Sequence, residues 1–346
     1  MSVPTPSEDR QRRAAPGRLA LARRGALWAL AAVLLAGTGV GAGGGAAGGD
    51  PRAAGGAPVL PAPEAVAALA LPWPQEGQAA VAAAKVGVLG VKGPQRPVPI
   101  ASVTKVMTAY VVLRDHPLED GEDGPTITVD AQAAAEAGSA EESTAPVTAG
   151  QRLTQRKLLE VMLLPSANNV ARLLARWDAG SEEAFVSRMN AQAARLGMTG
   201  TTYTGASGLE ATTVSTAADQ LKLAREAMKD PALRATVALR DTTLPGRAAP
   251  LRNTNRLLDV PGVVGLKTGS TTSAGGNLMW ALQVADGTSG SGRRLVYGVV
   301  LAQRAGTTPA DGLRAALERS GLLVEALRQK LPGVLPALDG GRQEWA

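Results

Sequence analysis

The stretch Ser102-Val103-Thr104-Lys105 places a hydroxyl and an amine three residues apart at the start of a predicted helix. The helix is predicted over residues 102–113 because apolar side chains recur there at the spacing that buries one face. On such a helix the side chains of Ser102 and Lys105 share a face, with Cβ atoms roughly 5–6 Å apart. A serine hydroxyl becomes nucleophilic when a neighbouring base takes its proton, and lysine does so only where its charged form is destabilised. The stretch therefore predicts a serine nucleophile with a lysine base.

The composition excludes nucleophiles and metal sites that depend on cysteine or on several histidines. The chain of 346 residues has no cysteine and one histidine, His116, which lies in a loop-like segment, 114–117. Cysteine nucleophiles, thiolate zinc sites and histidine-rich metal sites are therefore excluded, and we expect no metal and no cofactor. One unclustered histidine gives little support for a serine–histidine–aspartate triad, so we expect His116 to be a solvated loop residue.

The N-terminal region has the order that is typical of a secretory signal or a signal anchor. Residues 1–24 contain six arginines and few apolar side chains, and residues 25–47 are apolar and then rich in small side chains. The strongly apolar part is about a dozen residues, nearer to a signal h-region than to the ~20 residues of a full membrane span. Cleavage and membrane anchoring both stay open. In either case the arginines predict a cytoplasmic N-terminus and an exported remainder.

The net charge of +6 comes mostly from this N-terminal region. Six arginines against Glu8 and Asp9 give +4 within residues 1–24, which leaves about +2 for the rest of the chain. The basic residues thus form a topology signal and not a phosphate-binding face, so we expect no nucleic-acid partner. Because there is no cysteine, stability must come from a packed core and not from disulfides.

Three further segments are predicted. Residues 48–75 are rich in Gly, Ala and Pro and indicate a linker, 76–330 form one folded domain, and 331–346 form a polar, proline-broken tail. Within the domain we expect the first and last strand groups to form one sheet and the helices between them a separate lobe. Strands are predicted at 79–89, 263–268, 277–285 and 295–303, and helices at 102–113, 153–164, 169–177, 181–196, 216–228 and 311–330.

Three short motifs fall where a site between the sheet and the helical lobe needs them. Ser102-x-x-Lys105 begins the first helix of the insert, Ser166-Ala167-Asn168 lies in a loop between two predicted helices, and Lys267-Thr268-Gly269 ends a predicted strand. Each motif alone is a weak signal, since Ser166 also suits a helix N-cap and Lys267 a solvated strand. Together, in this order, the motifs are the signature of penicillin-binding proteins and class A β-lactamases.

The chain resembles the D-alanyl-D-alanine carboxypeptidase family of low-molecular-weight penicillin-binding proteins over roughly residues 76–330. Beyond the motifs, segments 99–109, 166–171, 205–209 and 262–271 look like family sequence. The resemblance implies a serine β-lactamase/DD-peptidase-like fold of the α/β (α+β) class. Such a fold has an antiparallel sheet of about five strands flanked by helices, an all-helical lobe, and the active site between them.

The resemblance also implies a reaction and its partners. Ser102 is expected to attack the carbonyl between the two terminal D-alanines of a peptidoglycan stem peptide, to form an acyl-enzyme and to release the last D-alanine. β-Lactam antibiotics such as penicillin are expected to acylate the same serine. The expected location is the extracytoplasmic face of a bacterial cell membrane or the cell wall, with membrane contact through the N-terminal segment if that segment is not cleaved.

Each catalytic residue then has an expected role. Lys105 must be neutral to accept a proton, yet an ordinary lysine with a pKa of ~10.4 is charged at pH 7. Burial between the lobes and repulsion from Lys267 are expected to lower that pKa. The resemblance implies that Ser166 relays a proton toward the leaving amine and that Asn168 holds Lys105 or the substrate amide.

The substrate-binding residues are expected on the returning strand: Lys267, Thr268, Gly269 and Ser270. Thr268, with Lys267, is placed to receive the terminal carboxylate of the substrate. Gly269 is expected to leave room for an extended peptide beside an edge strand. The backbone N–H groups of Ser102 and Ser270 are the expected oxyanion donors, and losing one such donor typically costs ~10²–10³ in rate.

Two alternatives stay open. A class A-like β-lactamase has a deacylating Glu followed shortly by Asn, some ~35 residues beyond the serine–asparagine motif. Here the acid in that region is Glu210, and the residues after it, 211–214, contain no asparagine. The other alternative is a non-catalytic cell-wall-binding protein of the same fold, since sequence alone does not show that Lys105 is neutral.

Overall fold

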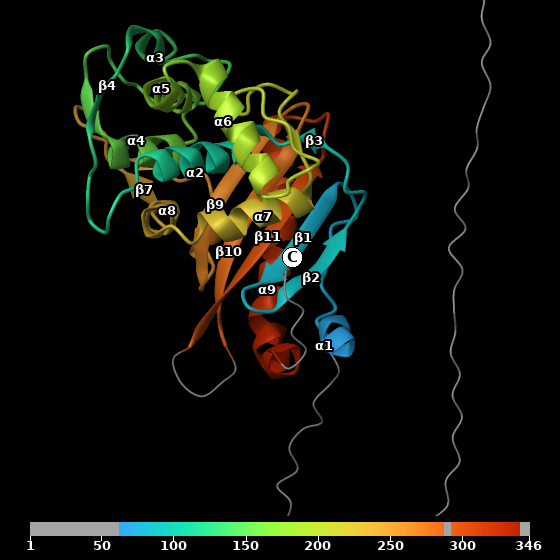
Figure 1. Cartoon of the computed structure of the whole chain (residues 1–346). Coiled ribbons are helices and arrows are strands. Elements are labelled where there is room, and N and C mark those ends of the chain that lie inside the picture. Colours follow the sequence, from blue (N-terminus) through green and yellow to red (C-terminus); the bar gives the residue numbers. More distant parts are fainter. Residues whose placement is uncertain (1–61, 287–291, 340–346) are drawn as a thin grey trace, which may run out of the picture. The chain divides into compact units, whose positions relative to one another are not determined.

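The centre of the fold is an antiparallel sheet of five strands in the order β2-β1-β11-β10-β9 (Figure 1). The structure is a computed structural model, and it describes residues 62–286 and 292–339. The strands are β1 (Gln78–Ala83), β2 (Gly87–Lys92), β9 (Val263–Thr271), β10 (Gly275–Ala285) and β11 (Arg293–Gln303). The first and last strand groups therefore pair in one sheet, β1 against β11, which confirms the prediction from the sequence.

Side chains on the strands alternate between two separate cores. Leu278, Trp280 and Leu282 of β10 face helix α9 (Pro309–Asp339) and helix α1 (Ala62–Ala68). Met279 and Ala281 of the same strand face the opposite core, which includes helix α7 (Ala217–Ala227). Both faces of the sheet are thus covered by helices, which explains why β1, β10 and β11 are almost wholly buried.

The helical lobe is formed by the segment between β2 and β9, as predicted. It is connected to the sheet by η1 (Ala101–Thr104), a 3-10 turn that leads directly into α2. Small two-stranded ribbons, β3/β6, β4/β5 and β7/β8, join its helices. Besides η1 and α7, its elements are β3 (Val98–Pro99), α2 (Lys105–Asp115), β4 (Thr126–Thr128), α3 (Ala131–Ala135), β5 (Arg152–Thr154), α4 (Gln155–Leu163), α5 (Asn168–Ala179), α6 (Glu182–Arg195), β6 (Val214–Ser215), α8 (Pro231–Val237), β7 (Asp241–Thr242), β8 (Leu251–Arg252) and η2 (Arg256–Asp259).

Local capping explains where several of these helices begin and end. The Ser181 hydroxyl accepts a hydrogen bond from the backbone N–H of Ala184 at 3.1 Å, and α6 ends before Gly197, whose φ is +65°. The Thr216 hydroxyl accepts from the N–H of Asp219 at 3.0 Å at the start of α7. Both helices therefore begin where the sequence predicted them, with caps at residues 181 and 216.

The C-terminal helix differs from its prediction, because α9 continues beyond residue 330 to Asp339 through Pro332 and Pro336. Leu331, Leu335 and Leu338 extend the apolar stripe of the helix and are buried against the sheet. Their burial, at roughly 1.5–3 kcal/mol each, offsets a penalty of about 3 kcal/mol for each interior proline. The predicted tail is thus helical up to residue 339.

Part of the predicted linker is also folded. Helix α1 buries Ala65, and Leu69 just after it is buried in the same core as α9. The Lys330 amine donates a hydrogen bond to the backbone oxygen of Leu69 at 3.0 Å. Val66, Leu71 and Trp73 also pack against this core, so the segment is docked by apolar contacts although it is rich in proline. The predicted basic segment 1–24, the predicted signal or anchor 25–47 and the linker up to residue 61 lie outside the described residues.

No helix within residues 62–286 and 292–339 has both the length and the apolar character that a membrane span needs.

Candidate active site

A pocket of about 780 Å³ lies where η1, the start of α5 and the end of β9 approach one another. Three of the predicted site residues line it: Ser102 from η1, Asn168 from α5 and Ser270 from β9. Four other predicted site residues do not line the pocket, because they are buried beneath its surface: Lys105, Ser166, Lys267 and Thr268. The remaining lining residues are Ala140, Glu141, Glu142, Ser143, Gly208, Leu209, Thr271, Thr272, Ser273, Gly306 and Pro309.

The amine of Lys105 has three hydrogen-bond partners. It lies 2.9 Å from the Ser102 hydroxyl, 2.5 Å from the Asn168 side-chain oxygen and 2.9 Å from the backbone oxygen of Ser207. The side chain is fully buried, with an exposed fraction of 0%. The serine, lysine and asparagine of two separate motifs therefore meet at one nitrogen atom.

The environment of Lys105 disfavours its charged form. Burial lowers the pKa of Lys105 well below that of an ordinary lysine, and the nearby charges of Lys267 and Arg172 lower it further. Glu142 and Glu210 act in the opposite direction, with smaller effects on this pKa. Both effects that the sequence predicted therefore lower the pKa of Lys105. Burial has the larger effect, and repulsion from Lys267 has the next largest.

Lys267 lies in the middle of β9 and is itself buried, with 1% of its surface exposed. Burial lowers the pKa of Lys267 to about 7. Its amine donates one hydrogen bond, to the backbone oxygen of Thr268 at 3.0 Å. The hydroxyls of Thr268 and Thr254 are 2.6 Å apart. Lys267 and Thr268 thus lie side by side on the edge strand next to Ser270, which faces the pocket.

Two residues beside the site have a backbone conformation that is rare for residues with a side chain. Ser166, between α4 and α5, has a φ of +69°, and Ala101, immediately before Ser102, has a φ of +47°. The Ser166 hydroxyl is buried and has no hydrogen-bond partner within the described residues. Backbone strain of this kind costs ~1–3 kcal/mol and occurs most often at functional sites.

Gly269 brings the sheet against the turn that carries the nucleophile. A Cβ atom at this position would lie 2.8 Å from the backbone nitrogens of Ser102 and Val103, and 2.9 Å from the backbone oxygen of Ile100. The sequence suggested a different reason for this glycine, namely space for a substrate peptide. In the structure the space beside Gly269 is already filled by η1.

The family-like segment 205–209 supports the buried side of the site. Besides the Ser207 oxygen on Lys105, the backbone oxygen of Ala206 accepts from the Thr108 hydroxyl at 2.6 Å. Gly208 has a φ of +79°, and a Cβ there would lie 2.1 Å from the backbone oxygen of Ala101. The segment therefore packs directly against η1 and α2.

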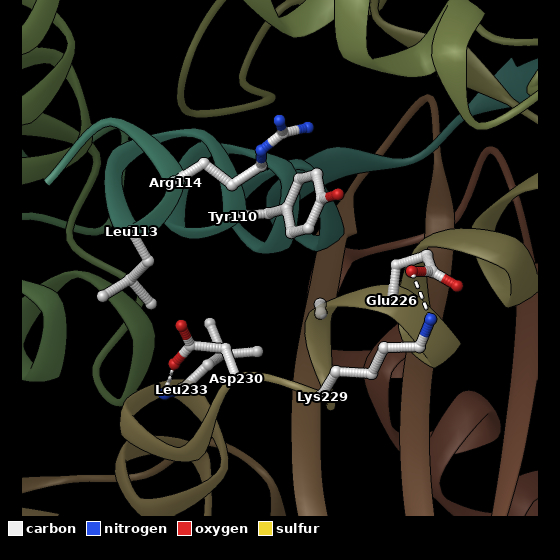
Figure 2. Close-up of a pocket in the computed structure, with 8 residues that line it drawn as sticks. Tyr110, Leu113, Arg114, Glu226, Lys229, Asp230 and Leu233 are labelled. Carbon is white, nitrogen blue, oxygen red and sulfur yellow. Dashed lines mark hydrogen bonds and ion pairs between the residues drawn. The ribbon is translucent and has the colours of Figure 1, made fainter. Parts of the chain in front are cut away.

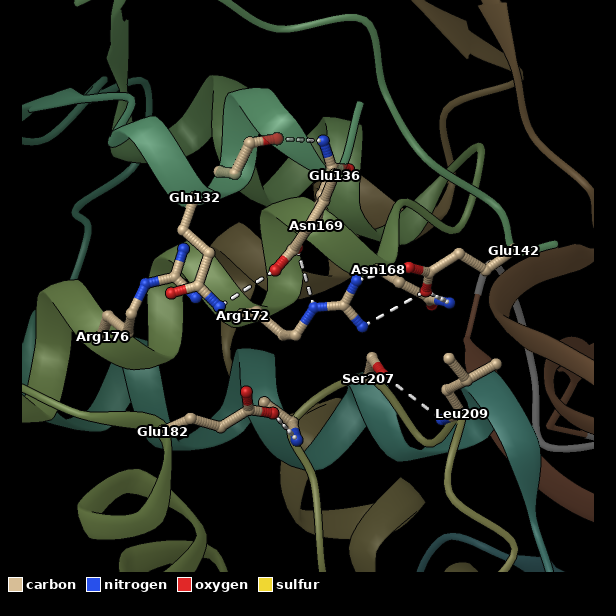
Figure 3. Close-up of polar contacts among 12 residues, drawn as sticks. Gln132, Glu136, Glu142, Asn168, Asn169, Arg172, Arg176, Glu182, Ser207 and Leu209 are labelled. Carbon is tan, nitrogen blue, oxygen red and sulfur yellow. Dashed lines mark hydrogen bonds and ion pairs between the residues drawn. The ribbon is translucent and has the colours of Figure 1, made fainter. Parts of the chain in front are cut away.

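The pocket wall also carries a charged group that was not predicted from the sequence, Glu142. Its carboxylate accepts hydrogen bonds from the Asn168 side-chain nitrogen at 2.6 Å and from the Arg172 guanidinium at 2.6 and 3.2 Å (Figure 3). Arg172 also donates to Glu136 at 2.8 Å. Arg172 follows Asn168 by four positions on α5, so the two side chains share one face. That spacing relates Asn168 to Arg172, but no local signal in the sequence pointed to Glu142.

His116 is only partly solvated, since 35% of its side chain is exposed. Its ring is tilted by 38° against that of Trp177, with centroids 4.1 Å apart, and its Nε2 lies 3.0 Å from the buried carboxylate of Asp178. It belongs neither to the pocket of Ser102 nor to any of the contacts described above.

A second pocket, of about 360 Å³, lies at the far end of the helix that begins with Lys105 (Figure 2). Leu113 and Tyr110 of α2 and Leu233 of α8 line it, with charged residues around them. No residue of the three motifs is among its lining residues, so the pocket of Ser102 is the candidate active site.

The sheet and helical lobe, with a serine held against a buried lysine between them, define a serine peptidase of the DD-peptidase class. Comparison with known protein families supports this assignment. Residues 77–302 match the family described as D-alanyl-D-alanine carboxypeptidase, peptidase family S11. The chain belongs to this family. The enzyme is therefore a serine-type hydrolase.

The relatives include D-alanyl-D-alanine endopeptidases and D-alanyl-D-alanine carboxypeptidases. A D-alanyl-D-alanine endopeptidase of Pseudomonas aeruginosa is 36% identical over 218 residues, which are 59% of this chain and 67% of that protein. A D-alanyl-D-alanine carboxypeptidase of Mycobacterium tuberculosis is 33% identical over 212 residues, 58% of this chain and 67% of the relative. Among solved structures, a mutant of the Streptomyces K15 DD-transpeptidase has a TM-score of 0.61 at 26% identity, over 72% of this chain and 96% of that one. The fold predicted from the sequence is confirmed.

Proposed function

We propose that the protein is an exported D-alanyl-D-alanine carboxypeptidase that removes the terminal D-alanine from peptidoglycan stem peptides through an acyl-enzyme on Ser102. The same serine is proposed to bind penicillin covalently. The observation that carries the proposal is the hydrogen bonding of Lys105 to Ser102, Asn168 and Ser207.

The three partners suit a neutral lysine that acts as a base. A neutral amine has two N–H bonds and one lone pair. The Asn168 side-chain oxygen and the Ser207 backbone oxygen are acceptors only, so they take the two N–H bonds. The lone pair is then left for the hydroxyl proton of Ser102, 2.9 Å away. This arrangement is what proton removal from the nucleophile requires.

The proposed reaction then has two stages. The Ser102 proton passes to Lys105 while the serine oxygen attacks the carbonyl carbon of the scissile amide. The C–N bond breaks as Ser166 relays that proton from Lys105 to the leaving amine, which departs as D-alanine. Water then attacks the ester while Lys105 takes a proton from it, and this proton returns to the Ser102 oxygen as the ester bond breaks. The buried Ser166 hydroxyl, which has no partner within the described residues, is available for this relay.

The edge strand is proposed to hold the substrate and the oxyanion. Ser102 and Ser270 both line the pocket, and close contact at Gly269 brings their backbones together. Their N–H groups are proposed as oxyanion donors, worth ~10²–10³ in rate each. Thr268, with the charge of Lys267 behind it, is proposed to bind the terminal carboxylate. Lys267 supplies that charge below its pKa of about 7.

A β-lactamase-like deacylation has less support. Glu210, the acid considered for it, is not among the residues that line the pocket. Glu142 does line the pocket, but both of its oxygens accept hydrogen bonds from Arg172, and one also accepts from Asn168. A carboxylate occupied in this way is poorly placed to activate a water molecule.

The test combines labelling and turnover. Incubation with penicillin, followed by mass spectrometry of tryptic peptides, should give one adduct on Ser102 that persists for many minutes, and Ser102→Ala should not react. A peptide ending in D-Ala-D-Ala should release D-alanine. Fast loss of the adduct would favour the β-lactamase, and labelling without D-alanine release would favour the binding protein.

A further inference from the structure

The side chain of Asn168 is held in one orientation by a carboxylate on the pocket wall. Its oxygen lies 2.5 Å from the Lys105 amine, and its nitrogen lies 2.6 Å from an oxygen of Glu142. A carboxylate only accepts hydrogen bonds, so it selects the NH₂ end of the amide and leaves the oxygen for the lysine. Glu142 thus determines which end of Asn168 faces the catalytic amine.

We infer that Glu142 is a positioning residue for the acylation step, which it serves by keeping the Asn168 side-chain oxygen on Lys105. The inference rests on the proposed function. If the Asn168 side-chain amide were flipped by about 180°, its NH₂ group would face the Lys105 nitrogen. The lone pair of the neutral amine would then accept a hydrogen bond from that NH₂ group. The Ser102 proton would then have no acceptor. The carboxylate prevents this competition.

Glu142 is itself fixed by Arg172. The guanidinium donates to one carboxylate oxygen at 2.6 Å and to the other at 3.2 Å, and its third nitrogen donates to Glu136 at 2.8 Å (Figure 3). Burial alone would raise the pKa of Glu142, but the hydrogen bonds from Arg172 and Asn168 outweigh it and keep the pKa below its usual value. Glu142 is therefore ionised, and an acceptor only, throughout the neutral range.

The loop that carries Glu142 is tied to the same helix end by its backbone. The N–H of Asn168 donates to the Ser143 oxygen at 2.8 Å. The side chain of Asn169 bonds the backbone N–H and oxygen of Ala145, both at 3.0 Å. Helix α5 thus holds the segment that directly follows Glu142 in the chain, which keeps the carboxylate in place on the pocket wall.

Electrostatics and positioning predict opposite effects of removing this carboxylate. The charge of Glu142 raises the pKa of Lys105, against the larger lowering by burial, Lys267 and Arg172, and Glu210 acts in the same direction as Glu142. Without Glu142 the lysine would be neutral over a wider pH range, and acylation would be unchanged or faster. A positioning role instead predicts slower acylation at every pH.

The experiment measures the acylation rate constant and the noncovalent affinity for penicillin, from pH 5 to 9, in the full-length chain. We expect Glu142→Ala to lower the rate constant about 10- to 100-fold, with little change in affinity. Glu142→Gln keeps an oxygen that can accept from Asn168 and should recover part of the rate. Glu136→Ala, which removes the other carboxylate on Arg172 but does not touch Asn168, should stay within about twofold of wild type.

A double-mutant cycle shows whether Glu142 acts through Asn168. In an Asn168→Ala background, Glu142→Ala should cause no further loss of rate. The inference is overturned if Glu142→Ala and Glu142→Gln both react at the wild-type rate, or if the loss persists in full without Asn168. A wild-type protein that penicillin does not label would instead refute the proposed function, so the two failures are distinguishable.

Discussion

The amine nitrogen of Lys105 lies 2.9 Å from the hydroxyl oxygen of Ser102, across the junction of a 3-10 turn and an α-helix. The same amine is held by Asn168 at the start of α5 and by the backbone oxygen of Ser207 in segment 205–209. Contacts from three segments far apart in the sequence therefore fix the amine against the serine before a substrate binds. Such preorganisation lowers the cost of reaching the transition state.

Replacing the amine should stop acylation. Lys105→Met keeps most of the apolar stem but removes the group that accepts the serine proton. We expect the rate of penicillin labelling to fall ~10²–10⁴-fold, the usual size of a general-base contribution. Lys229→Met is the control, since Lys229 is exposed and pairs with Glu226 on the surface. Similar labelling rates for the two variants would show that Lys105 is not the base.

Lys267 is expected to lower the stability of the fold. An ordinary lysine has a pKa of 10.5, and burial lowers that of Lys267 to about 7. Between these values the unfolded chain binds a proton that the folded chain does not, so the free energy of unfolding rises with pH from about 7 to about 10.5. Lys267→Met removes this effect and leaves one backbone oxygen, that of Thr268, without its side-chain donor.

The variant should therefore be more stable than wild type at pH 7 and below, by about 1–4 kcal/mol, with a difference that shrinks toward pH 10. Urea unfolding at several pH values measures it. Acylation by substrates with a free carboxylate should fall at the same time. A stability difference independent of pH would mean that the buried amine of Lys267 is not the cause.

Replacing Ser166 by alanine should lower activity without lowering stability. Its hydroxyl is buried without a hydrogen-bond partner in the described part of the chain, so Ser166→Ala removes a desolvated group and breaks no hydrogen bond there. We expect the melting temperature to be unchanged or higher, while D-alanine release falls by ~10²-fold, as for loss of a proton-transfer group. A variant with normal turnover would remove Ser166 from the proposed relay.

Much of the fold followed from local signals in the sequence. The helices that begin at Ser181 and Thr216 have side-chain caps, and the strands near the C-terminus have continuous apolar runs between glycine-rich turns. The order of the three motifs placed the site at the junction of sheet and lobe. Signals of this kind depend on residues close in the sequence, which is why they could be interpreted without a structure.

The remainder depended on contacts that the sequence does not encode locally. Glu142 lies 30 positions from Arg172 and in an ordinary polar loop, so nothing marked it before the fold joined them. The prolines of α9 indicated a helix end near residue 330, but the helix continues through them because Leu331 and Leu335 are buried against the sheet. In both cases tertiary packing decided the outcome.

Gly269 gives a test that separates the two explanations for a glycine at this position. A methyl group there would lie 2.8 Å from the backbone nitrogens of Ser102 and Val103, so β9 and η1 would have to move apart. We expect Gly269→Ala to lower the free energy of unfolding by about 1–3 kcal/mol. Penicillin labelling should fall by about 10²-fold, because the serine and its oxyanion donors shift together.

If the glycine served only to admit substrate, as the sequence suggested, Gly269→Ala would weaken peptide binding and leave the melting temperature unchanged. Gly333→Ala is the matched control: it lies in α9, and a Cβ there would meet nothing within 4 Å. Because alanine favours a helix over glycine by ~1 kcal/mol, the control should be equally or more stable than wild type, with unchanged labelling. Loss of both stability and labelling in Gly269→Ala alone would establish that this glycine positions the nucleophile.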